Sequence, residues 1–340
     1  MRNNIKKIFN YILIKISFIP LNLLIISTLI FILLRVAPGD PVDAILGSGA
    51  DEEARELLRV KLGLNDTFLN QYINYIKDLI SFNLGESLSN QEPVINIISS
   101  ALPATIELAL FSILIAICIG FPLGYIGLKN KNKKYDYISR IIGISTYAIP
   151  PFWGAMMFQL IFSVTFRLLP IGGRFPISEP ISNITGFMIL DCILKNDITA
   201  LRGAIYHLAL PSITLGFLLS GIFSRSLRLN LEKAYKSDYV NSAICRGINE
   251  KNIFLNYAFP NALIPIFTIT GFAIASLTGG ALLIEVTYSW PGIALKLQEA
   301  ILQRDYNLVQ GIVIIISILI ISINLVIDIL IACFDPRVKF

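Results

Sequence analysis

Charged side chains are scarce in this 340-residue chain. Only 15% of its residues are Asp, Glu, Lys or Arg, whereas 55% are hydrophobic, and the mean hydropathy is +0.70. So little polar material cannot cover the surface of a soluble domain of this size, which excludes an ordinary water-soluble fold. The composition therefore predicts a protein of the lipid bilayer.

Histidine and cysteine are also nearly absent. The chain has one histidine, His207, and four scattered cysteines without a CxxC pair: Cys118, Cys192, Cys245 and Cys333. This spacing builds neither a local zinc site nor a disulfide framework, and one histidine without a nearby Ser or Cys arrangement makes no catalytic triad. We therefore expect no metal and no structural disulfide.

The sequence has no phosphate loop either. Its glycine-rich stretch, Gly120, Gly124 and Gly127, ends in Leu128-Lys129 inside an apolar segment, where small residues more often serve helix packing. We predict that the chain is not an enzyme, hydrolyses no ATP and carries no cofactor. The net charge of +5 does not indicate nucleic acid, because the basic residues fall in short clusters between apolar runs.

Long apolar segments are what the chain does contain. A helix needs roughly 20 apolar residues to cross a hydrocarbon core of about 30 Å. Six segments qualify: 14–36, 104–127, 138–165, 204–227, 262–286 and 308–333. The sequence thus predicts an all-α integral membrane protein with about six transmembrane helices. The basic start, MRNNIKK, precedes a long apolar run without a small-residue cleavage site, which favours an uncleaved anchor.

The positions of Lys and Arg predict the orientation. Most of the 28 basic residues lie before the first span, in the second-to-third and fourth-to-fifth connections, and after the sixth span. Because cytoplasmic connections are rich in Lys and Arg, both termini are predicted to be cytoplasmic. We expect residues 1–103 to form an anchor helix plus an external helical region. Residues 104–340 should form a five-helix core with a cytoplasmic loop at 225–260.

The first external connection is long and contains helical patterns. DEEARELLRVKLG has acids in its first turn and Gly63 where a C-terminal cap belongs, and QYINYIKDLI is a second amphipathic stretch. We predict short helices that lie against the outer membrane surface. A packed loop without a ligand role is the alternative.

Ionisable residues inside the predicted spans are few. Glu107, Asp328 and, near a span end, Glu285 are the candidates. A charge in hydrocarbon costs several kcal/mol and marks either a pair that stabilises the helices or a polar path across the membrane. Both interpretations stay open for Glu107 and Asp328.

Prolines interrupt two of the predicted spans. Pro150 and Pro151 lie in the middle of the third, and Pro211 lies in the fourth. Each removes a backbone donor and should kink or widen its helix. The freed carbonyls could line an aqueous path, although kinks of purely structural origin are as common.

The connection from Arg225 to Pro260 is polar but helical in pattern. Small Ser242 and Ala243 precede Gly247, which can adopt a positive φ and end one helix, and Asn249 can cap the next. Two short helices bent at a glycine can seat in a groove of a soluble partner. A solvated helical hairpin without a partner is the alternative.

This loop resembles the signature loop of binding-protein-dependent ABC permeases, whose pattern is E-A-A, three residues, G, nine residues and I-x-L-P. Asn241-Ser242-Ala243 stand at the E-A-A positions, Gly247 at the glycine and Tyr257-Ala258-Phe259-Pro260 at the end. The Glu is absent here, as is usual in the dipeptide/oligopeptide branch. Other strings resemble that branch in order along the chain: RVAPGDP at 35–41, GLNDTFLNQY at 63–72, NLGESL at 83–88, ALPATIELAL at 101–110, SWPGIALKLQEAILQRDYNLVQG at 289–311 and DPR at 335–337.

The resemblance implies a type I ABC importer permease of the inner membrane. Its implied partners are a second homologous permease, two ATP-binding subunits and an external solute-binding protein. Dipeptides or oligopeptides are the implied substrates, with glutathione or nickel complexes as alternatives. The residues implied to couple to the ATPase are Asp238, Tyr239, Asn241, Ser242, Ala243, Gly247 and Pro260. An ion-coupled secondary carrier, which would need only this chain, is the rival hypothesis, and a membrane-embedded enzyme is disfavoured by the single histidine.

Overall fold

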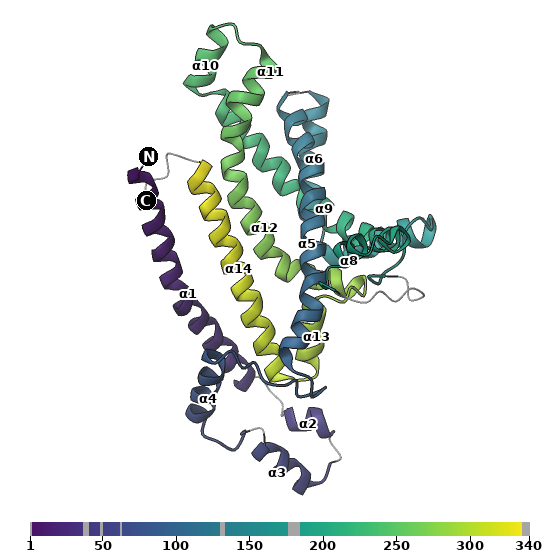
Figure 1. Cartoon of the computed structure of the whole chain (residues 1–340). Coiled ribbons are helices and arrows are strands. Elements are labelled where there is room, and N and C mark those ends of the chain that lie inside the picture. Colours follow the sequence, from purple (N-terminus) through teal and green to yellow (C-terminus); the bar gives the residue numbers. More distant parts are fainter. Residues whose placement is uncertain are drawn as a thin grey trace.

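The computed structural model describes residues 2–36, 41–47, 50–61, 63–129, 133–175 and 184–334. The described part is built from helices (Figure 1). The long ones are α1 (Arg2–Val36), α5 (Val94–Lys129), α9 (Ile198–Tyr235), α12 (Phe259–Thr287) and α14 (Tyr306–Phe334). Five helical stretches in these ranges are long and apolar enough to cross a membrane, and a bent pair adds a sixth if it counts as one span. The predicted all-α membrane fold is confirmed.

Several helices extend beyond the predicted spans. The second span was expected from residue 104, whereas α5 begins at Val94 and runs through Pro103. The predicted division of the chain after residue 103 therefore falls within a helix. Hydropathy finds only the most apolar part of a helix, and Pro103 lies inside α5 without ending it.

Close packing of α5 against α9 forms the centre of the fold. A Cβ atom on Gly120 would lie 2.6 Å from the Ser220 carbonyl oxygen, and one on Gly124 would lie 2.6 Å from that of Ser224. Only glycine permits these approaches, because real Cβ atoms do not come so near a carbonyl. The predicted packing role of these glycines is confirmed.

The third predicted span is not one helix. α7 (Pro151–Phe158) continues into the π-helix η1 (Gln159–Thr165), and this stretch is bent by 106° relative to α6 (Lys134–Ala148). Ile149 and Pro150 are extended, with ψ of 122° and 133°, as expected for residues that precede a proline. The predicted kink is therefore a full break. Pro211, by contrast, lies within the continuous helix α9, so the predicted distortion there does not interrupt the helix.

The short helices gather at the two ends of the long ones. α2 (Pro41–Leu46), α3 (Glu52–Lys61) and α4 (Phe68–Ile80) lie at one end, and α10 (Asp238–Cys245) and α11 (Glu250–Ile253) lie at the other (Figure 1). Gly63, with a φ of +65°, follows α3 as its predicted C-terminal cap. α8 (Met188–Leu194) and α13 (Ile293–Leu302) lie beside the core (Figure 1).

The first turns of α1 and the last turns of α14 lie at the same end as α10 and α11 (Figure 1). α1 packs mainly along α14, and a Lys15–Asp328 ion pair joins the two helices. Residues 37–40 of the RVAPGDP string lie outside the described residues, and the DPR string at 335–337 lies wholly outside them.

Candidate functional site

The loop between α9 and α12 is folded around a glycine turn. The Gly247 N–H donates to the Ile244 carbonyl (2.9 Å), and the Ile248 N–H donates to the Ala243 carbonyl (3.2 Å). This hydrogen-bond pair is a Schellman motif, which requires a left-handed residue between its two helices. Gly247 supplies it with a φ of +72°, so the predicted positive φ is confirmed.

The second helix of the loop is capped as predicted. The Asn252 N–H donates to Asn249 Oδ1 (2.8 Å), and Glu250 lies in the first turn of α11. The chain then passes through the π-helix η2 (Phe254–Ala258) into α12. Pro260 is the second residue of α12 and directly follows the π-helical turn.

Ala243 does not lie on the outer surface of the loop. It is 2% exposed and packs with Val240 and Ile253 in a small core that belongs to the loop itself. Ala243, which the family resemblance implies to be a coupling residue, therefore faces the inside of the loop. Helical spacing alone did not reveal that α10 folds back onto α11.

The exposed face of α10 consists of side chains other than those of Val240 and Ala243. Asp238, Asn241 and Ser242 are exposed, and Tyr239 is half-buried. Ile244 is 53% exposed, although it is a large apolar side chain at the tip of a polar loop. Such a residue buries its surface when a partner covers it.

A series of ring contacts joins the loop to the core. Phe254 of η2 contacts Tyr125 of α5 (centroids 4.6 Å apart) and Phe259 of α12 (5.3 Å). Phe121 of α5 contacts both Phe259 (6.2 Å) and Phe223 of α9 (6.5 Å). We call these five residues the aromatic column. It packs the loop against three long helices at once.

An ion-pair cluster holds α6 to α9 near the same end. Asp136, which is 1% exposed, accepts from Arg228 (2.8 Å) and from Arg140 (3.0 Å). Basic residues of these connections indicated only the orientation in the sequence, and Asp136 was not among the predicted site residues. An acid within a basic cluster was the available signal.

Glu107 lies in a second buried ion pair, towards the other end of α5. Its carboxylate accepts from Arg174 Nη2 (2.8 Å) and from the Ile189 N–H in the first turn of α8 (2.8 Å). Arg174 also lies over the Trp290 ring, 5.9 Å from the centroid. These contacts connect α5, α8 and the α12–α13 turn, so Glu107 has a clear packing role.

Glu285 is fully buried at the α12–α13 turn. It accepts from the Thr105 hydroxyl (2.6 Å) and from the Leu295 N–H (2.9 Å). Thr105 Oγ1 in turn accepts from the Ile293 N–H (2.8 Å). Gly292 is required beside it, because a Cβ there would lie 2.2 Å from the carboxylate. The first residues of the segment 289–311 thus form a turn that is hydrogen-bonded to α5.

The remaining sequence candidates are separated from the loop. Asp328 pairs with Lys15 on α1, Pro150 and Pro151 form the α6–α7 break, and Pro211 lies within α9. The structure brings Asp238 to Pro260 together in one loop but does not gather the other candidates into one site. Among the described residues, no three His, Cys, Asp or Glu side chains are placed to hold a metal.

Comparison with known proteins covers nearly the whole chain. Residues 116–340 match the family described as binding-protein-dependent transport system inner membrane component, and residues 8–109 match the N-terminal region of such components. The chain is 36% identical over 310 residues to the dipeptide transport system permease protein DppB of Alkalihalophilus pseudofirmus, which covers 91% of this chain and 93% of that protein.

Two further relatives have similar coverage. The di/tripeptide transport system permease protein DppB of Pseudomonas aeruginosa is 34% identical over 315 residues, 92% of this chain and 94% of its own. The probable D,D-dipeptide transport system permease protein DdpB of Escherichia coli is 34% identical over 314 residues, 92% of each chain.

Proposed function

Because the chain belongs to the family of binding-protein-dependent transport system inner membrane components, we propose that it carries small peptides across the inner membrane. It is a permease of the ABC importer type and a multi-pass protein of that membrane. Peptide specificity is proposed from the names of relatives that are 31–36% identical over most of the chain.

The loop from Asp238 to Pro260 is the observation that carries the coupling part of the proposal. It has its own small core, its bend at Gly247 is built into the backbone, and the aromatic column joins it to α5, α9 and α12. A force applied to α10 by a soluble subunit would therefore reach three long helices through packed rings. ATP-driven movement of that subunit would shift the equilibrium between conformations open to either side.

The proposed assembly contains a second homologous permease, two ATP-binding subunits and an external solute-binding protein. ATP is hydrolysed by the separate subunits, so this chain is a conduit and not an enzyme. Both termini and the α10–α11 loop are proposed to be cytoplasmic, because the basic clusters gather at that end. α2, α3 and α4 are then external.

Reconstitution tests this function. The chain, its partner permease and the ATPase subunits are placed in liposomes, and uptake of a labelled dipeptide is measured with and without ATP, in the presence of the solute-binding protein. We expect uptake that requires both ATP and the binding protein. Uptake by this chain alone, driven by an ion gradient, would instead establish the secondary carrier.

Competition distinguishes the substrate classes. Unlabelled oligopeptides, glutathione and a nickel complex are added in excess to the same assay. The proposal expects peptides to compete. Competition by glutathione or by the nickel complex, without competition by peptides, would show that the competing compound represents the substrate class.

A further inference from the structure

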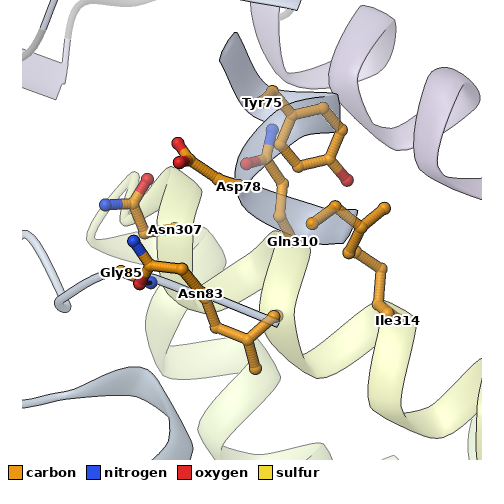
Figure 2. A pocket seen from close by; sticks show the side chains of 10 residues that line it. Tyr75, Asp78, Asn83, Gly85, Asn307, Gln310 and Ile314 are labelled. Atoms are coloured by element: carbon orange, nitrogen blue, oxygen red, sulfur yellow. Dashed lines mark hydrogen bonds between the residues drawn. The ribbon is translucent and has the colours of Figure 1, made fainter. Parts of the chain in front are cut away.

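A small pocket lies between α4, the segment that follows it and the first turns of α14. Its volume is about 90 Å³, room for roughly three water molecules, and polar side chains form much of its wall. Asp78, Asn83 and Asn307 lie on one side of the view in Figure 2, and Tyr75, Gln310 and Ile314 lie on the other. We call it the α4–α14 pocket. It is at the end of the molecule opposite α10 and α11.

Two buried polar atoms in this wall have no hydrogen-bond partner among the described residues: Tyr75 Oη and Gln310 Nε2. Gln310 is only 7% exposed. A buried polar group without a partner is costly, and native proteins seldom keep one without a use. Asn83 and Asn307, by contrast, are engaged, since Asn83 Oδ1 accepts from the Gly85 N–H (3.1 Å) and Asn307 donates to the Glu86 carbonyl (2.9 Å).

An exposed aromatic side chain immediately precedes Asn83 of the pocket wall in the sequence. Phe82 is 88% exposed and has a φ of +55°. It occupies the left-handed position of a Schellman motif after α4, because the Asn83 N–H donates to the Asp78 carbonyl (2.9 Å). Glycine is the usual residue at such a position, because a side chain disfavours the left-handed conformation. Phe82 is therefore present on the surface at a conformational cost.

The segment that contains α2, α3 and α4 is acidic. Residues 41–93 contain nine Asp and Glu but four Lys and Arg, a net charge of −5, whereas the whole chain has a net charge of +5. Asp78 itself is exposed at the pocket. A positively charged protein surface is therefore attracted to this end of the molecule.

We propose that the α4–α14 pocket, together with Phe82, is a docking site for one basic side chain of the external solute-binding protein. Asp78 would accept from the ammonium or guanidinium group, and the Tyr75 hydroxyl would accept from it deeper in the pocket. A rotation of 180° about the Cγ–Cδ bond of Gln310 would direct its Oε1 into the pocket. This oxygen would then be a third acceptor for the basic group. Phe82 would pack against the aliphatic part of that basic side chain or against the surface of the solute-binding protein around it. This inference rests on the proposed function, since it requires an external binding protein.

A free peptide fits the pocket less well than a side chain does. The volume holds one polar head group. A small recess in an acidic segment that also exposes an aromatic side chain is typical of a protein contact, in which an anchor residue enters a recess. The docking partner is therefore expected to bind more weakly as the salt concentration rises.

The test measures binding to the assembled transporter in nanodiscs. The probe is the solute-binding protein that stimulates ATP hydrolysis by the wild-type complex, and the readouts are its Kd and the stimulated ATPase activity. We expect Asp78→Asn and Gln310→Leu each to weaken binding at least fivefold, with unstimulated ATPase activity unchanged. Glu53→Gln is the matched control, because it removes one exposed acid from α3 of the same acidic region but is not part of the pocket wall.

Phe82→Gly separates docking from folding. Glycine suits the left-handed position, so this variant should be at least as heat-stable as the wild type and yet bind the probe several-fold more weakly. Binding within twofold of wild type for both Asp78→Asn and Gln310→Leu would overturn the inference, as would equal weakening by Glu53→Gln. If the wild-type complex were never stimulated by any solute-binding protein, the proposed function itself would fail.

Discussion

At the scale of single residues, Gly247 is the position where the sequence and the structure agree most closely. Its left-handed φ costs a residue with a Cβ about 1–2 kcal/mol. Among the described residues other than its two chain neighbours, no atom lies within 4 Å of the place where that Cβ would be, so the cost comes from the backbone and not from a clash with them.

We therefore expect Gly247→Asn to be tolerated, Gly247→Ala to loosen the loop and Gly247→Val to loosen it most, because Asn adopts this conformation more readily than Ala or Val. Hydrogen exchange over residues 238–253 measures the loosening, and co-purification of the ATPase subunits measures its consequence. Equal exchange and equal co-purification in Gly247→Val would show that the Schellman turn does not shape the contact.

Asp191 anchors the turn that leads into α8. Its carboxylate accepts from the Thr185 N–H (2.9 Å) and hydroxyl (2.6 Å), and from the N–H groups of Ile184 (3.1 Å) and Gly186 (3.2 Å). Burial alone would raise the pKa of Asp191, but the hydrogen bonds outweigh it and lower the pKa below its ordinary value of 3.8.

Because the folded-state pKa is lowered, the anchor stabilises the turn at neutral pH. It is lost only as the pH falls below 3.8 towards the folded-state value. Asp191→Asn should destabilise the turn by roughly 1–3 kcal/mol at pH 7 and remove the acid sensitivity. Proteolysis within residues 184–194, measured at pH 7 and in acid, tests this. Asp197→Asn, which affects the start of α9, should leave that turn intact.

At the scale of elements, the aromatic column is the connection between the loop and the core. Ring pairs of this kind contribute about 0.5–1.5 kcal/mol beyond the area that they bury. Phe254→Leu removes the two contacts made by η2 while leaving an apolar side chain in place.

We expect Phe254→Leu to keep the ATPase subunits bound but to lower peptide uptake per ATP hydrolysed several-fold, since the loop would move without the helices. Phe272→Leu is the control, because Phe272 is 66% exposed on α12 and lies outside the column. Parallel loss of ATPase binding and uptake would assign Phe254 to loop folding alone.

The sequence predicted the elements better than their contacts. Apolar length identified the long helices, and glycine and asparagine identified the joint at Gly247 and the cap at Asn249, because these signals are local. The pairing of Glu107 with Arg174 joins residues 67 positions apart and leaves no local pattern. The inward position of Ala243 and the 106° break at Pro150 likewise depend on what each helix packs against.

At the scale of the whole molecule, the orientation can be tested by labelling. In a variant without the four native cysteines, a cysteine replaces Lys133 at the α6 end or Asn90 before α5. A membrane-impermeant thiol reagent should label Asn90→Cys in intact spheroplasts and Lys133→Cys only after the cytoplasmic side is opened. Labelling of Lys133→Cys from outside would reverse the proposed orientation.

The break between α6 and α7 has a consequence for the life of the chain before assembly. α6 has 15 residues, so the break lies about 22 Å along the helix axis, where a lone subunit meets lipid tails. Two consecutive prolines leave backbone carbonyls without donors there, and hydrocarbon cannot supply them. An orphan chain should therefore be recognised by membrane proteases. Its half-life in a pulse-chase experiment should lengthen when the second permease is co-expressed.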